Sequence, residues 1–231
     1  KIQVLTCMLG TLSSHTKNKK NINQIKKMIN ALQLVSLSDF ILAIQCIFLA
    51  GFIFGKIKSH TSRAGLLGYF LFFAGLSAFM GGIDHGFFEP IDQRYYPRTF
   101  TYLFVAAATF FIFQYTIVTF TKGKIRAFLT GFAYVQLIAF IVSSFYYHNF
   151  ILVVGNYSPV LLFFFIMNLI NLKKGKSEQN FSLFCTIMII ATLIQVSEIN
   201  LSELVNSDTL FHIIAFIGYF FMFSGIKQIK E

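Results

Sequence analysis

Long uncharged apolar stretches alternate with short polar connections along most of the chain. A helix needs about 20 apolar residues to cross a bilayer, and seven stretches approach that length. They lie at 38–55, 64–88, 99–121, 127–147, 149–172, 180–198 and 208–226. The first is the weakest, since only sixteen residues separate Asp39 from Lys56 and it needs residues 31–38 to cross. The pattern predicts an all-α membrane bundle of seven transmembrane helices over residues 31–231.

Composition supports a membrane location and excludes several classes of protein. Hydrophobic residues make up 56% of the chain and charged residues 12%, with a mean hydropathy of +0.69, whereas about 25% of residues are charged in soluble domains. The spans use up nearly the whole length, which leaves no room for a separate catalytic domain. Cys7, Cys46 and Cys185 are far apart and form no CxxC pair, so neither a disulfide framework nor a zinc-thiolate site is indicated.

The basic residues are scattered between apolar spans, although the formal net charge is +10. A nucleic-acid partner is therefore excluded, because it would require them on one soluble face. Eleven fall in alternate connections and the C-terminal tail, namely Lys56, Lys58, Arg63, Lys122, Lys124, Arg126, Lys173, Lys174, Lys176, Lys227 and Lys230. The opposite connections hold Arg94 and Arg98. The positive-inside rule then predicts a cytoplasmic C-terminus and an N-terminus outside.

Residues 1–30 form a polar, basic segment that lacks the long apolar core of a signal peptide. We interpret it as a tail that is either disordered or not native to the protein. Because the chain opens with Lys1, Met28 is a candidate start, and a genuine basic tail is the alternative. A basic tail outside the membrane would also conflict with the predicted orientation.

Acidic residues gather toward the predicted outer side. Asp84 and His85 are adjacent at the end of the second span, where an ionisable side chain is costly without a partner or water and is a functional-site hypothesis by default. Four acids lie nearest the hydrocarbon and should face inward, since lipid exposure costs about 2.5–3.5 kcal/mol each: Asp39, Asp84, Glu198 and Asp208. Glu89, Asp92 and Glu203 are interpreted as a solvated rim.

Two imidazoles and a carboxylate are predicted to meet at one membrane depth. Asp208 and His212 are four residues apart and share one face of the last span. The second span runs outward and the last runs inward, which places His85 at their depth. Three such ligands and a water molecule are the arrangement of catalytic Zn²⁺, whose bound water becomes a nucleophile near neutral pH. Asp84 or Asp92 would then be a fourth ligand, a ligand-orienting residue or a general base.

A structural interpretation of the same residues is the alternative. Asp208 would cap the last helix, because Asp is a favoured N-cap, while His85 and His212 would form hydrogen bonds between helices. No local metal-binding motif such as HExxH occurs in the sequence. Both interpretations stay open at this point.

Further polar residues are expected to line a pocket around this site. The predicted pocket residues are Asp39, Ser77, Asn156, Gln195 and Glu198. Ser77 lies eight residues before His85, about 12 Å along a helix axis, so we expect it to pack with Gly75 against a neighbouring helix and not to act as a nucleophile. Gly81 and Gly82 are expected to loosen the helix and re-aim Asp84 and His85.

These features together resemble a known superfamily. Seven helices with an outer N-terminus, a Ser and a His late in helix two, an Asp soon after and a one-turn pair in helix seven are similar to the CREST superfamily of alkaline ceramidases and progestin/adipoQ-type receptors. The resemblance implies that His85 and His212 match zinc ligands and that Asp92 matches the family's acid. The chain differs in having Asp208 in place of a second helix-seven His, and Ser77 two turns from His85.

Two function classes follow from the sequence. The first is a Zn²⁺-dependent hydrolase of a lipid amide or ester, and the second is a non-enzymatic membrane sensor, carrier or assembly factor using the same outward-facing pocket. Both imply the lipid bilayer as surroundings, a lipid or small amphiphilic ligand, and a plasma (inner) membrane location of bacterial type. A retinal photoreceptor is disfavoured, because no lysine lies between Asp208 and Lys227 for a Schiff base.

Overall fold

The computed structural model describes the backbone of residues 2–229 and the side chains of residues 28–149 and 151–229. No strand occurs within residues 2–229. The helices are α1 (Ile2–Phe54), α2 (Arg63–Ile83), α3 (Tyr95–Phe120), α4 (Gly123–Tyr146), α5 (Phe150–Ile170), α6 (Lys176–Val196) and α7 (Ser207–Ile226). A π-helical turn (Asp84–Phe88) and short 3-10 turns (Glu89–Ile91 and Leu172–Lys174) occur in the connections.

The described residues contain seven helices long and apolar enough to cross a membrane. The prediction of an all-α, seven-helix membrane bundle is confirmed, and the protein is a multi-pass integral membrane protein. The first span runs from Met28 to Phe54, which makes up for its short uncharged stretch, and the second continues through the π turn to Ile91. The predicted basic tail over 1–30 lies almost wholly outside the residues whose side chains are described.

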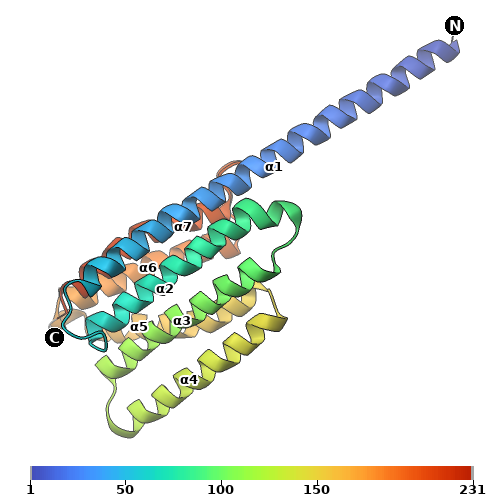
Figure 1. Ribbon diagram of the computed structural model, residues 1–231. Coiled ribbons are helices and arrows are strands. Elements are labelled where there is room, and N and C mark those ends of the chain that lie inside the picture. Colours follow the sequence, from blue (N-terminus) through green and yellow to red (C-terminus); the bar gives the residue numbers. More distant parts are fainter. Residues whose placement is uncertain (1, 230–231) are drawn as a thin grey trace.

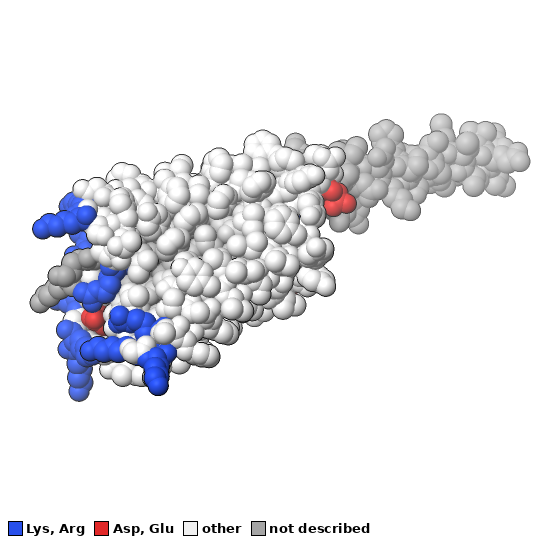
Figure 2. Space-filling model, turned by 60° about the horizontal axis from the view of Figure 1, so that its bottom comes forward, with Lys and Arg blue, Asp and Glu red and all other residues white. Residues whose placement is uncertain are grey.

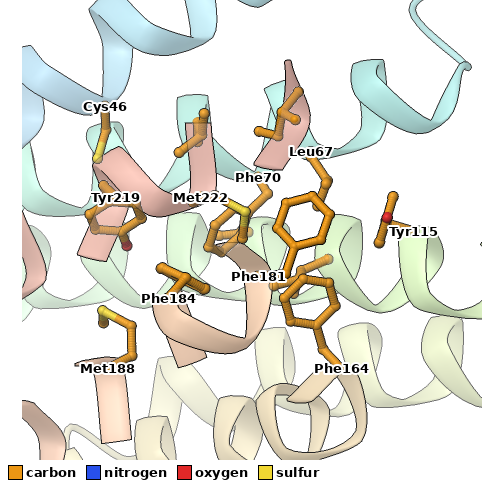
Figure 3. Close-up of a cluster of buried hydrophobic side chains, with 14 of the residues drawn as sticks. Cys46, Leu67, Phe70, Tyr115, Phe164, Phe181, Phe184, Met188, Tyr219 and Met222 are labelled. Atoms are coloured by element: carbon orange, nitrogen blue, oxygen red, sulfur yellow. The ribbon is translucent and has the colours of Figure 1, made fainter. Parts of the chain in front are cut away.

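The helices form a bundle in which α2 lies between α1 and α3 (Figure 1). Helix α7 packs against α6 and α1, and α4 lies at the edge of the bundle and packs mainly against α3. The core is rich in aromatic rings from α5, α6 and α7, as Figure 3 shows. Phe164, Phe181 and Phe184 are fully buried there. The outlying position of α4 leaves most of its apolar side chains facing outward.

Small residues let α1 closely approach α2 and the π turn that follows it, as is common between membrane helices. A Cβ at Gly82 would lie 2.9 Å from the ring of Phe40, and one at Gly86 would lie 2.5 Å from Ser36 Oγ. Ser36 Oγ also donates to the Gly82 carbonyl at 2.7 Å. Helix α2 stays regular through Gly81 and Gly82 to Ile83, where it passes directly into the π turn that carries Asp84 and His85. Gly82 serves close packing against Phe40, and the expectation that the two glycines re-aim Asp84 and His85 stays a prediction.

The connections sort into two ends of the bundle. The "basic end" comprises the α1–α2, α3–α4 and α5–α6 connections and the end of α7, and Figure 2 shows Lys and Arg side chains gathered there. The "site end" comprises the α2–α3, α4–α5 and α6–α7 connections. Successive helices cross the bundle in opposite directions, so each connection, together with the residues beside it, lies at a defined end. Which end faces the cytoplasm stays a prediction from the positive-inside rule.

Candidate functional site

A cavity of about 760 Å³ runs into the bundle from the site end. Every helix except α4 contributes to its lining. Its depth is apolar, with Phe70, Phe184, Met188 and Tyr219 seen together in Figure 3. From Phe70 to Asp84 the lining follows α2 over fourteen residues, about 21 Å at 1.5 Å per residue. Cavities of roughly 300–1,000 Å³ are the usual size of small-molecule sites.

Asp84 is buried at the cavity mouth and neutralised by arginine. Arg94 Nε donates to both Asp84 oxygens at 3.0 Å, and Arg94 Nη2 lies 2.6 Å from Asp84 Oδ2. Arg98 Nε adds a weaker contact at 3.4 Å. The Glu89 N–H donates to the Asp84 carbonyl, which closes the π turn, a rare geometry frequent at functional sites. Asp84 thus anchors the start of α3 to the end of α2, and its oxygens are not free to act as a base.

His85 lines the same cavity from within the π turn. Its Nδ1 lies 2.5 Å from Glu89 Oε2, and Glu89 Oε1 lies 2.5 Å from Arg94 Nη1. Glu89 is therefore a partner of His85 and Arg94, and its interpretation as part of a solvated rim is wrong. The four-residue spacing of His85 and Glu89 is the sequence signal that could have identified this pair.

His212 joins α7 to α1 through both ring nitrogens. Nδ1 lies 2.9 Å from Ser38 Oγ and Nε2 lies 3.1 Å from Asp39 Oδ1. Ser38 Oγ donates its only hydrogen to the Val35 carbonyl at 2.7 Å, so it accepts from Nδ1. One proton then remains for the contact between Nε2 and Asp39 Oδ1, whichever of the two carries it. The His212–Asp39 pair is consequently neutral as a unit.

Asp208 lies in the first turn of α7 and lines the cavity. Its Oδ1 accepts from Gln195 Nε2 at 2.9 Å, which ties α7 to the end of α6. The cap of α7 is Asn206, whose side chain accepts from the Thr209 N–H at 3.0 Å. The alternative interpretation of Asp208 as the N-cap is therefore wrong, and its carboxylate is directed to the cavity mouth instead.

The remaining predicted residues are divided between this cavity and other places. Ser77 lines the cavity and donates to the Thr101 carbonyl at 3.3 Å, while Glu198 lines the exposed mouth. Asp92 is exposed directly after the 3-10 turn and does not line the cavity. Asn156 is hydrogen-bonded to Gln136, between α5 and α4, and lines a much smaller pocket. The structure thus gathers Asp39, Ser77, Asp84, His85, Gln195, Glu198, Asp208 and His212, and leaves out Asp92 and Asn156.

The predicted metal ligands share the cavity but do not form a ligand set. Among residues 28–149 and 151–229, no group of three or more His, Cys, Asp or Glu side chains is placed to hold a metal ion. His212 has both nitrogens in contact with protein, and His85 and Asp208 are each hydrogen-bonded to a neighbour. As placed, these residues do not fit a zinc ion with three protein ligands.

Sequence reasoning missed several residues of the mouth. Arg94 and Arg98 were used only for topology, yet their spacing of four and their charge, opposite to that of the nearby acids, mark them as partners. His148 lines the cavity from the α4–α5 connection, and its Nε2 lies 2.8 Å from Thr99 Oγ1. Partial burial and the positive charge of Arg98 lower the pKa of His148. Ser38 gave no signal, because its partner is 174 residues away.

Comparison with known proteins identifies a family. Residues 34–231 match the model of DUF6962, described as a family of unknown function, and the chain belongs to that family. No curated protein and no solved structure matches the chain.

Proposed function

We propose that this member of the DUF6962 family binds a membrane amphiphile in the cavity between its helices. The observation that carries the proposal is one continuous cavity, charged at the site end and apolar in its depth. A hydrocarbon chain fits the depth, and a polar head fits the mouth. A sensor or carrier of such a ligand is the class of protein that this arrangement supports best.

Recognition would come mainly from the polar head. Lipid tails are as apolar as the lining of the depth, so a chain that leaves the bilayer for the cavity gains little from the hydrophobic effect. Hydrogen bonds in the mouth can favour binding more than the alkyl chain does, because the donors and acceptors there are already held in place. Asp84 is fixed by Arg94, Glu89 by Arg94 and His85, and Asp39 by His212. Such preorganisation reduces the ordering cost of binding.

Filling the apolar depth tests the proposal. Ala74 and Ala78 line the cavity from α2, whereas Ala139 is exposed on the outer face of α4. We expect Ala74→Phe and Ala78→Phe to abolish lipid that remains bound to detergent-purified protein in native mass spectrometry, and Ala139→Phe to leave it unchanged. Parent protein that carries no amphiphile, with or without added lipid extract, would contradict the proposal.

Zinc-dependent hydrolysis of a lipid amide or ester is a second candidate, together with the CREST resemblance that suggested it. The observation in its favour is that His85, Asp208 and His212 all line one cavity. A metal ion at this site would require His212 to release Asp39 or Ser38. We therefore rank zinc-dependent hydrolysis below ligand binding as a candidate function. One zinc per chain, lost in both His85→Ala and His212→Ala, would put hydrolysis first. Purified protein that binds lipid but takes up no zinc would remove this candidate.

A further inference from the structure

The charges that line the cavity do not balance. Five carboxylates line it, against the two guanidinium groups of Arg94 and Arg98 and the imidazole of His85, which contacts Glu89. Those two arginines contact Asp84 and Glu89, and Asp39 shares one proton with His212. Asp208 and Glu198 have no Lys or Arg partner within residues 28–149 and 151–229. The mouth therefore keeps an excess of negative charge on the side formed by α1, α6 and α7.

Hydrogen-bond acceptors are also in excess there, which is an independent observation. Asp39 is 3% exposed, and its Oδ2 is buried without a hydrogen-bond partner. The same is true of Gln195 Oε1, on the residue whose Nε2 donates to Asp208. Asp39, Gln195 and Asp208 all line the same cavity. Asp39 Oδ2 and Gln195 Oε1 thus lack a donor, while Asp208 accepts from Gln195 Nε2 and has no Lys or Arg partner among the residues with described side chains.

We propose that the head of the bound amphiphile carries a primary ammonium group, held by Asp208, Gln195 Oε1 and Asp39 Oδ2. This inference rests on the proposed amphiphile binding and specifies its ligand class. An ammonium group has three N–H donors and no acceptor, which matches three acceptors and one uncompensated carboxylate. Asp39 Oδ2 can accept whether the shared proton lies on His212 or on Asp39 Oδ1. The alkyl chain would extend past Phe70 into the apolar depth.

The test compares amphiphiles that differ only in the head. The full chain is placed in nanodiscs of zwitterionic lipid at pH 7.5 and titrated calorimetrically with dodecylamine, dodecyltrimethylammonium, dodecanol and dodecanoic acid. We expect dodecylamine to bind at least about 30-fold more tightly than dodecanol, as for a buried charged hydrogen bond. Dodecyltrimethylammonium, which has the charge but no N–H, should bind between the two. Equal affinity for amine and alcohol, or for amine and trimethylammonium, would overturn the inference.

Single-residue variants test where in the cavity the ammonium group binds. Asp208→Asn keeps an acceptor for Gln195 Nε2 but removes the charge, and Gln195→Leu removes Oε1; both should lose most of the preference for amine over alcohol. Asp92→Asn is the matched control, since Asp92 is exposed and outside the cavity, and it should keep the preference. A full preference in Asp208→Asn that melts like the parent would contradict the site.

Two further results distinguish a failure of the ammonium site from a failure of the proposed amphiphile binding. Methylamine supplies the same head without a chain, and binding as tight as that of dodecylamine would show that the cation is not part of an amphiphile. Binding of all four long-chain compounds with equal affinity would leave the proposed function intact and remove only the ammonium site. Binding of none of them would remove both.

Discussion

Charged residues lie at both ends of the bundle, but in opposite surroundings. At the basic end the lysines are exposed; Lys56 lies over the ring of Phe52, 4.1 Å from its centroid, and Arg126 donates to helix-end carbonyls. At the site end Arg94 and Asp84 have 16% and 5% exposed side chains and contact each other directly. The first arrangement serves membrane topology, since it needs only water and lipid heads. The second fixes geometry, because each buried charge needs one specific partner.

Breaking the Arg94 cluster should have the largest effect. Arg94→Ala leaves Asp84 without its main partner in a buried site, which typically costs about 3–5 kcal/mol. At the basic end, Lys124→Ala should change stability by less than about 0.5 kcal/mol. Unfolding of both variants in detergent, followed by circular dichroism, measures the contrast. Similar small losses in both would show that the two ends do not differ as described.

A double variant sharpens the same contrast. Asp84→Asn removes the charge that Arg94 neutralises, so the loss in Asp84→Asn with Arg94→Ala should be smaller than the sum of the single losses. Additive losses would mean that the two residues act separately.

Close packing of α1 on the π turn (Asp84–Phe88) at the site end should show an intermediate effect. In Gly86→Ala the new Cβ would lie 2.5 Å from Ser36 Oγ, and overpacking of this kind costs about 1–3 kcal/mol. The matched control is Gly131→Ala on α4, where a Cβ meets nothing within 4 Å and helix propensity favours Ala by up to about 1 kcal/mol. Thermal melting should thus move in opposite directions for the two variants. A rise in melting temperature for Gly86→Ala would contradict the packing described.

The smallest predicted effect is a pH dependence at His148. Its pKa is lowered in the folded protein, so the unfolded chain binds its proton more readily. Stability from this residue is therefore complete above the ordinary His pKa of about 6.5 and is lost as pH falls below it. His148→Gln retains a hydrogen-bonding partner for Thr99 and should lose less thermal stability between pH 7.5 and 5 than the parent. An equal loss would show that His148 does not contribute.

Much of the fold could be predicted because its determinants are local. Apolar length specifies a span, and alternation of the connections specifies which residues share an end. His85, Asp208 and His212 were expected at one membrane depth on that basis, and all three line one cavity. Position along the membrane normal does not determine which side chains are neighbours. For that reason Asn156 was predicted to line a cavity that it does not line. Asp92 follows a 3-10 turn in a left-handed conformation with φ 55°, a local geometry that hydropathy does not report.

The partners within the site were the part least accessible from sequence. Arg94 reaches back over the π turn to Asp84, and a helical turn of this type has no clear composition signal. Ser38 and His212 meet only because α1 packs on α7. These contacts turn predicted metal ligands into occupied hydrogen-bonding groups, which changes the favoured function from catalysis to binding.

The most direct test of the amphiphile cavity uses the absence of tryptophan from the sequence. Phe70→Trp places an indole in the apolar lining, and Phe132→Trp places one on the exposed face of α4. Protein in nanodiscs is titrated with an alkylamine brominated near its chain end, and indole emission is followed. We predict saturable quenching of Phe70→Trp at one ligand per chain, relieved by unbrominated dodecylamine, with quenching of Phe132→Trp that rises only in proportion to the bromine content of the bilayer. Identical, non-saturating quenching of the two variants would contradict a ligand-binding cavity.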